Sequence, residues 1–194
     1  MNTLYPVISI LMALMVMLTS SQLPADEEWS YEWDALIPPN SQDSFWVKRG
    51  DGETKVRDDG FLISTSEEQS LIFFVTEEGS RGVWDGSVPV VIEFSAQTLP
   101  SNSKFESGAH LSVSNGTRCA AVKIRGEPDE HYRLEWRDGE ASLWVNGAEA
   151  NELIQILTLE PGNTMANCLY FGDESSTVGG DSLWHYIKWK PLQP

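Results

Sequence analysis

The chain has 194 residues, of which 29 are acidic and 13 are Lys or Arg, so its formal net charge is -16 at pH 7. This charge argues against nucleic acid or an anionic membrane as a partner, because binding either requires a basic surface. A neutral ligand, or one reached through a bound cation, fits better. A charge of this size also keeps a protein soluble without any role in binding.

Residues 1–25 have the pattern of a signal peptide. The run 7–18 is almost wholly apolar, and nothing before Asp26 is charged. This run is shorter than the ~20 residues that span a bilayer, and small and polar residues follow it, as in a cleavage region. We expect cleavage after Ala25, which gives a secreted, periplasmic or cell-surface protein with no membrane attachment. A cut after Ser21 and an uncleaved N-terminal anchor are the alternatives.

Residues 26–194 have the length of one domain and are built from short predicted strands. Runs of β-forming or alternating residues are separated by turns rich in Gly, Asn and Asp, and no segment keeps a 3.6-residue period. In chain order the runs are 29–33, 44–49, 53–57, 61–65, 70–76, 90–98, 111–114, 119–125, 131–137, 140–147, 168–172 and 183–190. Residues 148–159 fit either a helical turn or another strand. The pattern predicts an all-β sandwich.

The segment HYRLEWRDGEASLWVNG, residues 131–147, predicts a β-hairpin in detail. Asp138-Gly139 supplies the two positive-φ positions of a tight turn, which fixes the register and places Trp144 opposite Arg133. One face of the hairpin is then apolar and faces the core: Tyr132, Leu134, Trp136, Ala141, Leu143 and Val145. The other face, which includes Trp144, is predicted to be solvated.

Four segments carry a resemblance to a known superfamily: an N-terminal Trp-bearing strand, then VVIEFSAQT, YRLEWRDGEASLWVNG and LYFGDESSTVGGDSLWHYIKW. Their order is similar to that in secreted proteins of the concanavalin A-like lectin and glucanase superfamily, especially laminin-G-like domains. The resemblance implies a jelly roll of two antiparallel sheets. It also implies carbohydrate or protein binding and, in some members, a calcium ion.

Trp144 is the main candidate binding residue because the alternation of side chains along the strand places this large aromatic on the solvated face of the hairpin. It has two interpretations. In the first, the indole and Arg133 form a cation-π pair that only covers the sheet. Alternatively, the indole is a platform for the apolar face of a pyranose, whose hydroxyls bond to Arg133, Glu135 and Asn146.

Two loops supply further candidates. Trp84 and Asp85 lie in the Gly-rich sequence GVWDGS and form a second predicted exposed site. Asp173, Glu174 and Asp181 share the Gly-rich loop before the last strand. Carboxylate oxygens are the ligands that calcium prefers, so calcium binding and a merely polar turn are both open for this loop.

The two cysteines, Cys119 and Cys168, have two interpretations as well. An exported protein folds where thiols oxidise, which favours a disulfide between them. The alternative is a pair of buried, inert thiols.

Catalytic motifs are weak in this chain. The E-x-D-x-x-E run of the superfamily's glucanases is missing, and Glu93 stands alone on its strand. The sequence Gly-Asp-Ser-Leu at 180–183 matches a serine esterase motif, but only the last strand follows it, so no Ser-His-Asp triad can be assigned. We therefore expect a secreted, non-catalytic, lectin-like domain that binds carbohydrate. An adhesion or scaffold domain that binds an extracellular protein is the alternative, and a glycoside hydrolase or lyase is a minor one.

Overall fold

The computed structural model describes residues 28–41, 45–66, 68–76, 84–100, 109–161, 167–173 and 179–192. The predicted signal peptide, residues 1–25, lies outside the described residues. In the described ranges, no helix has the length and apolar character needed to cross a membrane.

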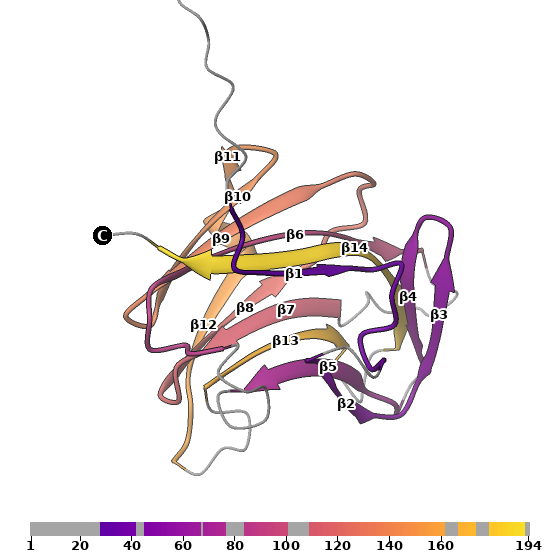
Figure 1. The fold of residues 1–194 in the computed structure, drawn as a ribbon, viewed down its shortest axis with the longest axis horizontal. Coiled ribbons are helices and arrows are strands. Elements are labelled where there is room, and N and C mark those ends of the chain that lie inside the picture. The colour runs from indigo at the N-terminus through magenta and orange to yellow at the C-terminus, as the bar shows by residue number, and fades with distance from the viewer. Residues whose placement is uncertain are drawn as a thin grey trace, which may run out of the picture.

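Two antiparallel sheets pack face to face (Figure 1). The larger sheet has the order β11 (Ala148–Glu149), β10 (Glu140–Val145), β9 (His131–Arg137), β6 (Val90–Leu99), β14 (Gly180–Pro191), β4 (Gly60–Thr65) and β3 (Glu53–Arg57), and β1 (Tyr31–Asp34) also pairs with β14. The smaller sheet has the order β12 (Ile154–Thr158), β8 (Arg118–Lys123), β7 (Ala109–Ser114), β13 (Cys168–Asp173), β5 (Leu71–Thr76) and β2 (Val47–Gly50). The predicted all-β sandwich of two antiparallel sheets is confirmed.

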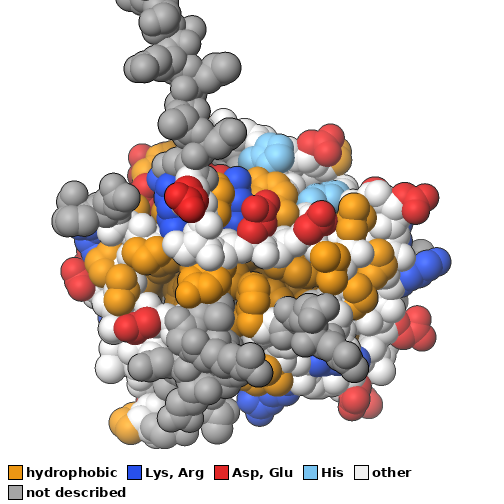
Figure 2. All heavy atoms as spheres, in the orientation of Figure 1, with side chains coloured by type: hydrophobic (Ala, Val, Ile, Leu, Met, Phe, Trp, Pro, Cys, Tyr) orange, Lys and Arg blue, Asp and Glu red, His pale blue; other side chains and the backbone are white. Residues whose placement is uncertain are grey.

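The core lies between the sheets and is rich in aromatic rings. Phe171 of β13 is fully buried, and its ring centroid lies 4.9 Å from those of Trp33 and Trp46 and 4.7 Å from that of Trp184. In Figure 2, apolar side chains gather in a band between the sheets, and charged side chains gather above that band. The larger sheet therefore has one apolar inner face and one polar outer face.

The predicted hairpin is confirmed in register. Trp144 pairs with Arg133, and the chain turns at Asp138 and Gly139 with φ angles of 53° and 80°. These are the left-handed positions that a type I′ turn requires, so the local sequence fixes the pairing. Residues 148–159 contain both predicted alternatives, because a 3-10 turn (Asn151–Leu153) lies between β11 and β12.

The predicted disulfide is wrong: Cys119 and Cys168 are both buried thiols. Cys119 lies opposite Ser114 in β7, and the backbone N–H of Cys168 donates to Ser114 Oγ from the other side at 3.0 Å. Strand β7 thus separates the two cysteines, and two strand spacings amount to roughly 10 Å. A disulfide needs Cα atoms within about 7 Å.

This arrangement predicts the behaviour of the thiols. In native protein, neither thiol should react with a thiol reagent such as DTNB on the timescale of minutes, because both are buried. In denaturant, both should react, and the intact mass should be that of the fully reduced chain. A denatured protein that showed no reactive thiol would instead mean that the two cysteines are bonded and that β7 is misplaced.

Candidate functional site

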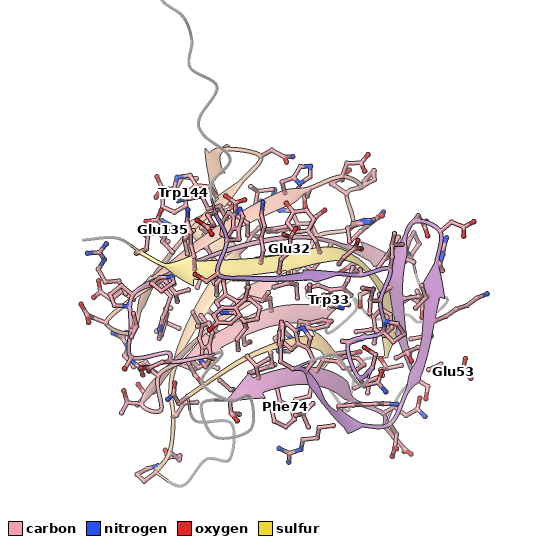
Figure 3. The ribbon with its side chains drawn as sticks, in the orientation of Figure 1. Glu32, Trp33, Glu53, Phe74, Glu135 and Trp144 are labelled. Atoms are coloured by element: carbon pink, nitrogen blue, oxygen red, sulfur yellow. The ribbon has the colours of Figure 1, made fainter. Side chains whose placement is uncertain are left out.

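A single row of side chains crosses the outer face of the larger sheet. From β10 to β1, consecutive strands place Trp144, Arg133, Glu93, Lys188 and Glu32 directly opposite one another. In Figure 3, Glu32 and Trp33 lie on opposite sides of their strand, Trp33 toward the core and Glu32 toward the outer face. After Trp144 the row alternates in charge, so neighbours across the strands attract one another.

Glu93 is the centre of an ion-pair network in this row. Its carboxylate lies 2.9 Å from Arg133 Nη1 and 3.3 Å from Lys188 Nζ, and Arg133 Nη2 lies 3.3 Å from Glu135 Oε1. Partial burial by itself would lower the pKa of Arg133, but the hydrogen bonds and charges of Glu93 and Glu135 raise that pKa above its usual value. The guanidinium is therefore charged and held in one position.

Three residues of this row, Trp144, Arg133 and Glu93, are among the described residues that line an open hollow of about 720 Å³. The lining comes from four neighbouring strands and the turn after β10: Glu93, His131, Tyr132, Arg133, Trp144, Asn146, Gly147 and Tyr186. The structure thus brings together Trp144, Arg133 and Asn146 of the predicted site. Glu135 does not line the hollow, but it holds the guanidinium that does.

His131 and Tyr186 form a bridge along one side of the hollow. His131 Nδ1 and Tyr186 Oη share a hydrogen bond of 3.1 Å, and their ring planes differ by 27°. They belong to strands that are not adjacent, because Ser95 of β6 lies between them in register. Ser95 is buried beneath the outer face, and its small side chain leaves room for the two rings to meet.

Asn146 fixes the end of the hairpin next to His131. It has a φ of 50°, its backbone N–H donates to His131 O at 2.8 Å, and its Oδ1 accepts from His131 N at 3.0 Å. The side-chain carbonyl is therefore committed to the turn. Asn146 shapes the rim of the hollow beside Trp144.

Trp29 packs over the β14 end of the same face. Lys188 Nζ lies 4.4 Å from the Trp29 ring centroid and 5.4 Å from that of Tyr186, and Lys190 Nζ lies 4.9 Å from the Trp29 centroid. These are cation-π distances, so the two lysines hold the indole against the sheet.

The prediction that Trp84 is exposed is wrong, since only 2% of this residue is accessible. The loop behind it is pinned to the core: Trp136 Nε1 donates to Gly86 O at 2.9 Å, and Gly86 N donates to Asn167 Oδ1 at 2.7 Å. Asp85 is exposed, but its Oδ1 accepts from the backbone N–H and hydroxyl of Ser87 in a local turn. Neither Trp84 nor Asp85 lines the hollow.

The structure also does not bring Asp173 and Asp181 together. Asp173 is buried and accepts a hydrogen bond from Thr65 Oγ1, whereas Asp181 accepts one from Ser64 Oγ at 2.5 Å. Ser64 and Thr65 are neighbours in β4, so their side chains point to opposite faces of the larger sheet. The two carboxylates that they bond therefore lie on different sides of that sheet. Glu174 lies outside the described residues. Among the residues that are described, no three His, Cys, Asp or Glu side chains cluster as metal ligands.

Ser182 of the Gly-Asp-Ser-Leu motif is buried at the start of β14. Its Oγ accepts a hydrogen bond from Trp184 Nε1 at 3.0 Å. This hydroxyl faces the core, so the motif has a structural role in the larger sheet.

Tyr132 lies beneath the hollow and bonds to a buried acid. Its hydroxyl donates to Glu130 Oε2 at 2.5 Å and accepts from the backbone N–H of Arg125 at 3.0 Å. Burial, and then the hydrogen bond to Glu130, raise the pKa of Tyr132 far above its usual value. Burial and the charges of Glu93 and Glu32 also raise the pKa of Tyr186.

These shifts predict a loss of stability in alkali. An unfolded tyrosine ionises near pH 10, whereas folded Tyr132 and Tyr186 hold their protons more tightly, so the contribution is complete below pH 10 and declines above it. We expect Tyr132 alone to cost about 1 kcal/mol of unfolding free energy by pH 11. Urea unfolding at pH 9 and pH 11 measures this loss, and Tyr132→Phe should reduce it. An unchanged unfolding free energy would contradict the buried Tyr132–Glu130 bond.

The sheet order and the aromatic core define a β-sandwich of two antiparallel sheets. The carbohydrate esterase of Shiga toxin-encoding bacteriophage phi24B has a similar fold, with a TM-score of 0.54 and 9% identity over 86% of this chain and 99% of that protein. The metal-free exoplasmic/lumenal domain of VIP36 is similar with a TM-score of 0.52 and 7% identity over 84% and 92%. No family model and no curated protein sequence matches the chain.

Proposed function

We propose that this protein is a secreted, non-catalytic lectin-like domain that binds carbohydrate in the hollow beside Trp144. We also infer that the sandwich is a concanavalin A-like jelly roll related to laminin-G-like domains. One observation carries the functional proposal: a half-buried tryptophan lies at the rim of an open hollow whose other side chains are mostly polar or aromatic.

The residues of the hollow suit a sugar chemically. The axial C–H groups of a pyranose pack against an indole, and its hydroxyls both donate and accept hydrogen bonds. Arg133 supplies N–H donors, while Glu93 and Tyr186 supply oxygen acceptors. Glu93 is the one carboxylate in the described lining and is held by two cations, whereas glycoside hydrolysis uses a pair of carboxyl groups.

The similar structures support a carbohydrate ligand only in a general way. The phage protein is a carbohydrate esterase, and VIP36 has also been solved with Ca²⁺ and mannose bound. Those are properties of the two proteins.

A glycan array tests the proposal. Wild-type mature protein should bind at least one glycan, and Trp144→Ala should lower the affinity about tenfold, a change of about 1.4 kcal/mol in binding free energy, because it removes the stacking surface. Trp144→Phe keeps an aromatic face and should retain part of the binding. The thermal midpoints of all three proteins serve as the folding control. If the folded wild-type protein bound no glycan, or if Trp144→Ala bound as well as wild type, the proposal would fail.

Binding of an extracellular protein is a second candidate function, favoured by the edge strand β12. Native edge strands are usually short or charged, which discourages pairing with other chains. Among the outermost strands of the described sheets, β11 has two residues, and β2 and β3 carry Lys and Arg. By contrast, β12 has the uncharged sequence IQILT, and Ile156 and Leu157 are 37% and 42% exposed.

Two variants separate the candidates in a cell-surface binding assay. Leu157→Lys places a charge on the edge without touching the hollow, and Trp144→Ala does the reverse. Binding that survives enzymatic removal of cell-surface glycans and is lost in Leu157→Lys would favour a protein ligand. Binding that is lost in Trp144→Ala and after removal of the glycans would favour the lectin function.

A further inference from the structure

The hollow runs across the strands of the larger sheet. Its lining extends from Trp144 on β10 to Tyr186 on β14, with β9 and β6 between them. Neighbouring strands lie about 4.8 Å apart, so these three spacings amount to roughly 14 Å. A single pyranose ring covers about one aromatic ring, and it would therefore occupy only one end of the hollow.

Both ends of the hollow carry aromatic side chains. Trp144 stands at the β10 end. At the β14 end, Tyr186 lines the hollow and is bonded to His131, and Lys188 and Trp29 pack beside Tyr186 outside the lining. The floor between the two ends is formed by Arg133 and Glu93. The order of contacts along the hollow is therefore aromatic, polar and aromatic, which matches sugar rings joined in a chain.

The charges of the hollow favour a neutral ligand. Arg133 is bonded to both Glu93 and Glu135, and Lys188 is bonded to Glu93. An anionic sugar would have to displace one of these carboxylates from its cation, and the chain's net charge of -16 would oppose its approach. A neutral sugar can add hydrogen bonds without breaking an ion pair.

Building on the proposed function, we propose that the hollow binds a neutral, linear oligosaccharide laid across the strands, with at least two sugar residues in contact. Trp144 stacks on one residue, and the His131–Tyr186 pair contacts another residue further along the chain. The site thus selects for chain length, because a monosaccharide gains only one of the two aromatic contacts.

A length series tests this inference. Wild-type protein is titrated with neutral gluco-, manno- and galacto-oligosaccharides from monosaccharide to hexasaccharide, and with oligogalacturonates as the anionic series. In the series that binds, we expect the trisaccharide to bind about tenfold or more tightly than the monosaccharide, a difference of about 1.4 kcal/mol. Affinity should then level off. The oligogalacturonates should bind more weakly than every neutral series that binds.

Two variants test the two aromatic contacts of the hollow. Trp144→Ala should weaken all lengths, whereas His131→Ala should weaken only the longer oligosaccharides and flatten the dependence on length. His131 is exposed, so this variant keeps the core intact, and its thermal midpoint confirms folding. Equal affinities for monosaccharide and trisaccharide, or tighter binding of the oligogalacturonates, would overturn this inference alone. No binding in any series would overturn the proposed function with it.

Discussion

Replacing Trp84 with alanine is expected to lower the free energy of unfolding by about 3–5 kcal/mol, the range for removing a large buried aromatic. The side chain is 2% accessible, and its ring centroid lies 6.3 Å from that of Trp189 in an edge-to-face arrangement. The change removes a bicyclic ring from between the sheets, and the surrounding side chains can close the cavity only in part. Urea unfolding followed by circular dichroism measures the loss.

Trp144→Ala is the matched control for this prediction. Both changes remove one indole, but Trp144 lies on the outer face at the rim of the hollow and is only half-buried. Its loss should cost about 1 kcal/mol of stability or less, in keeping with an aromatic contact at an exposed site. Similar losses in the two variants would mean that Trp84 does not lie in the core.

Gly86→Ala is expected to be the second severe change and to cost about 3 kcal/mol, the upper end of the usual range for overpacking. A Cβ at residue 86 would lie 2.0 Å from Ser114 O and 2.9 Å from Asn167 Oδ1. The loop would have to move away from β7, and this movement would weaken the bond that Trp136 Nε1 donates to Gly86 O.

Gly126→Ala is the control for Gly86→Ala. There the added Cβ would come within 3.3 Å of Thr98 O, a much milder contact. We expect its effect on the unfolding free energy to stay below about 1 kcal/mol. Equal effects in a chemical denaturation series would show that the loop holding Trp84 does not pack tightly against β7.

The sequence predicted those parts of the fold that depend on neighbouring residues. The Asp138-Gly139 turn fixes the pairing of Trp144 with Arg133, and alternation fixes which side chains face the core. Asn115 behaves similarly in the β7–β8 turn, where its Oδ1 accepts from the backbone N–H groups of Thr117 and Arg118. Such features are local, so a single sequence contains the information for them.

What depends on strand order could not be predicted. Glu93 and Tyr186 join the hollow because β6 lies beside β9 and β14 lies beside β6, and the alternation within each strand does not determine its neighbours. The same limit explains the cysteines, since only the sheet order shows that β7 separates Cys119 from Cys168. For Trp84, the Gly-rich loop indicated an exposed side chain. The structure gives another reason for the glycine at residue 86, because the loop lies too close to the backbone of Ser114 to leave room for a Cβ.

The proposed site is tested most directly by locating the bound sugar on the protein. Backbone amide shifts in NMR spectra should be recorded for residues 26–194 with and without the tightest-binding neutral oligosaccharide. We predict that the largest changes will lie on the outer face of four neighbouring strands, at Trp144, Arg133, Glu93 and Tyr186, with little change around buried Trp84. Changes confined to the smaller sheet or to β12, with Trp144 and Arg133 unmoved, would contradict the proposed site.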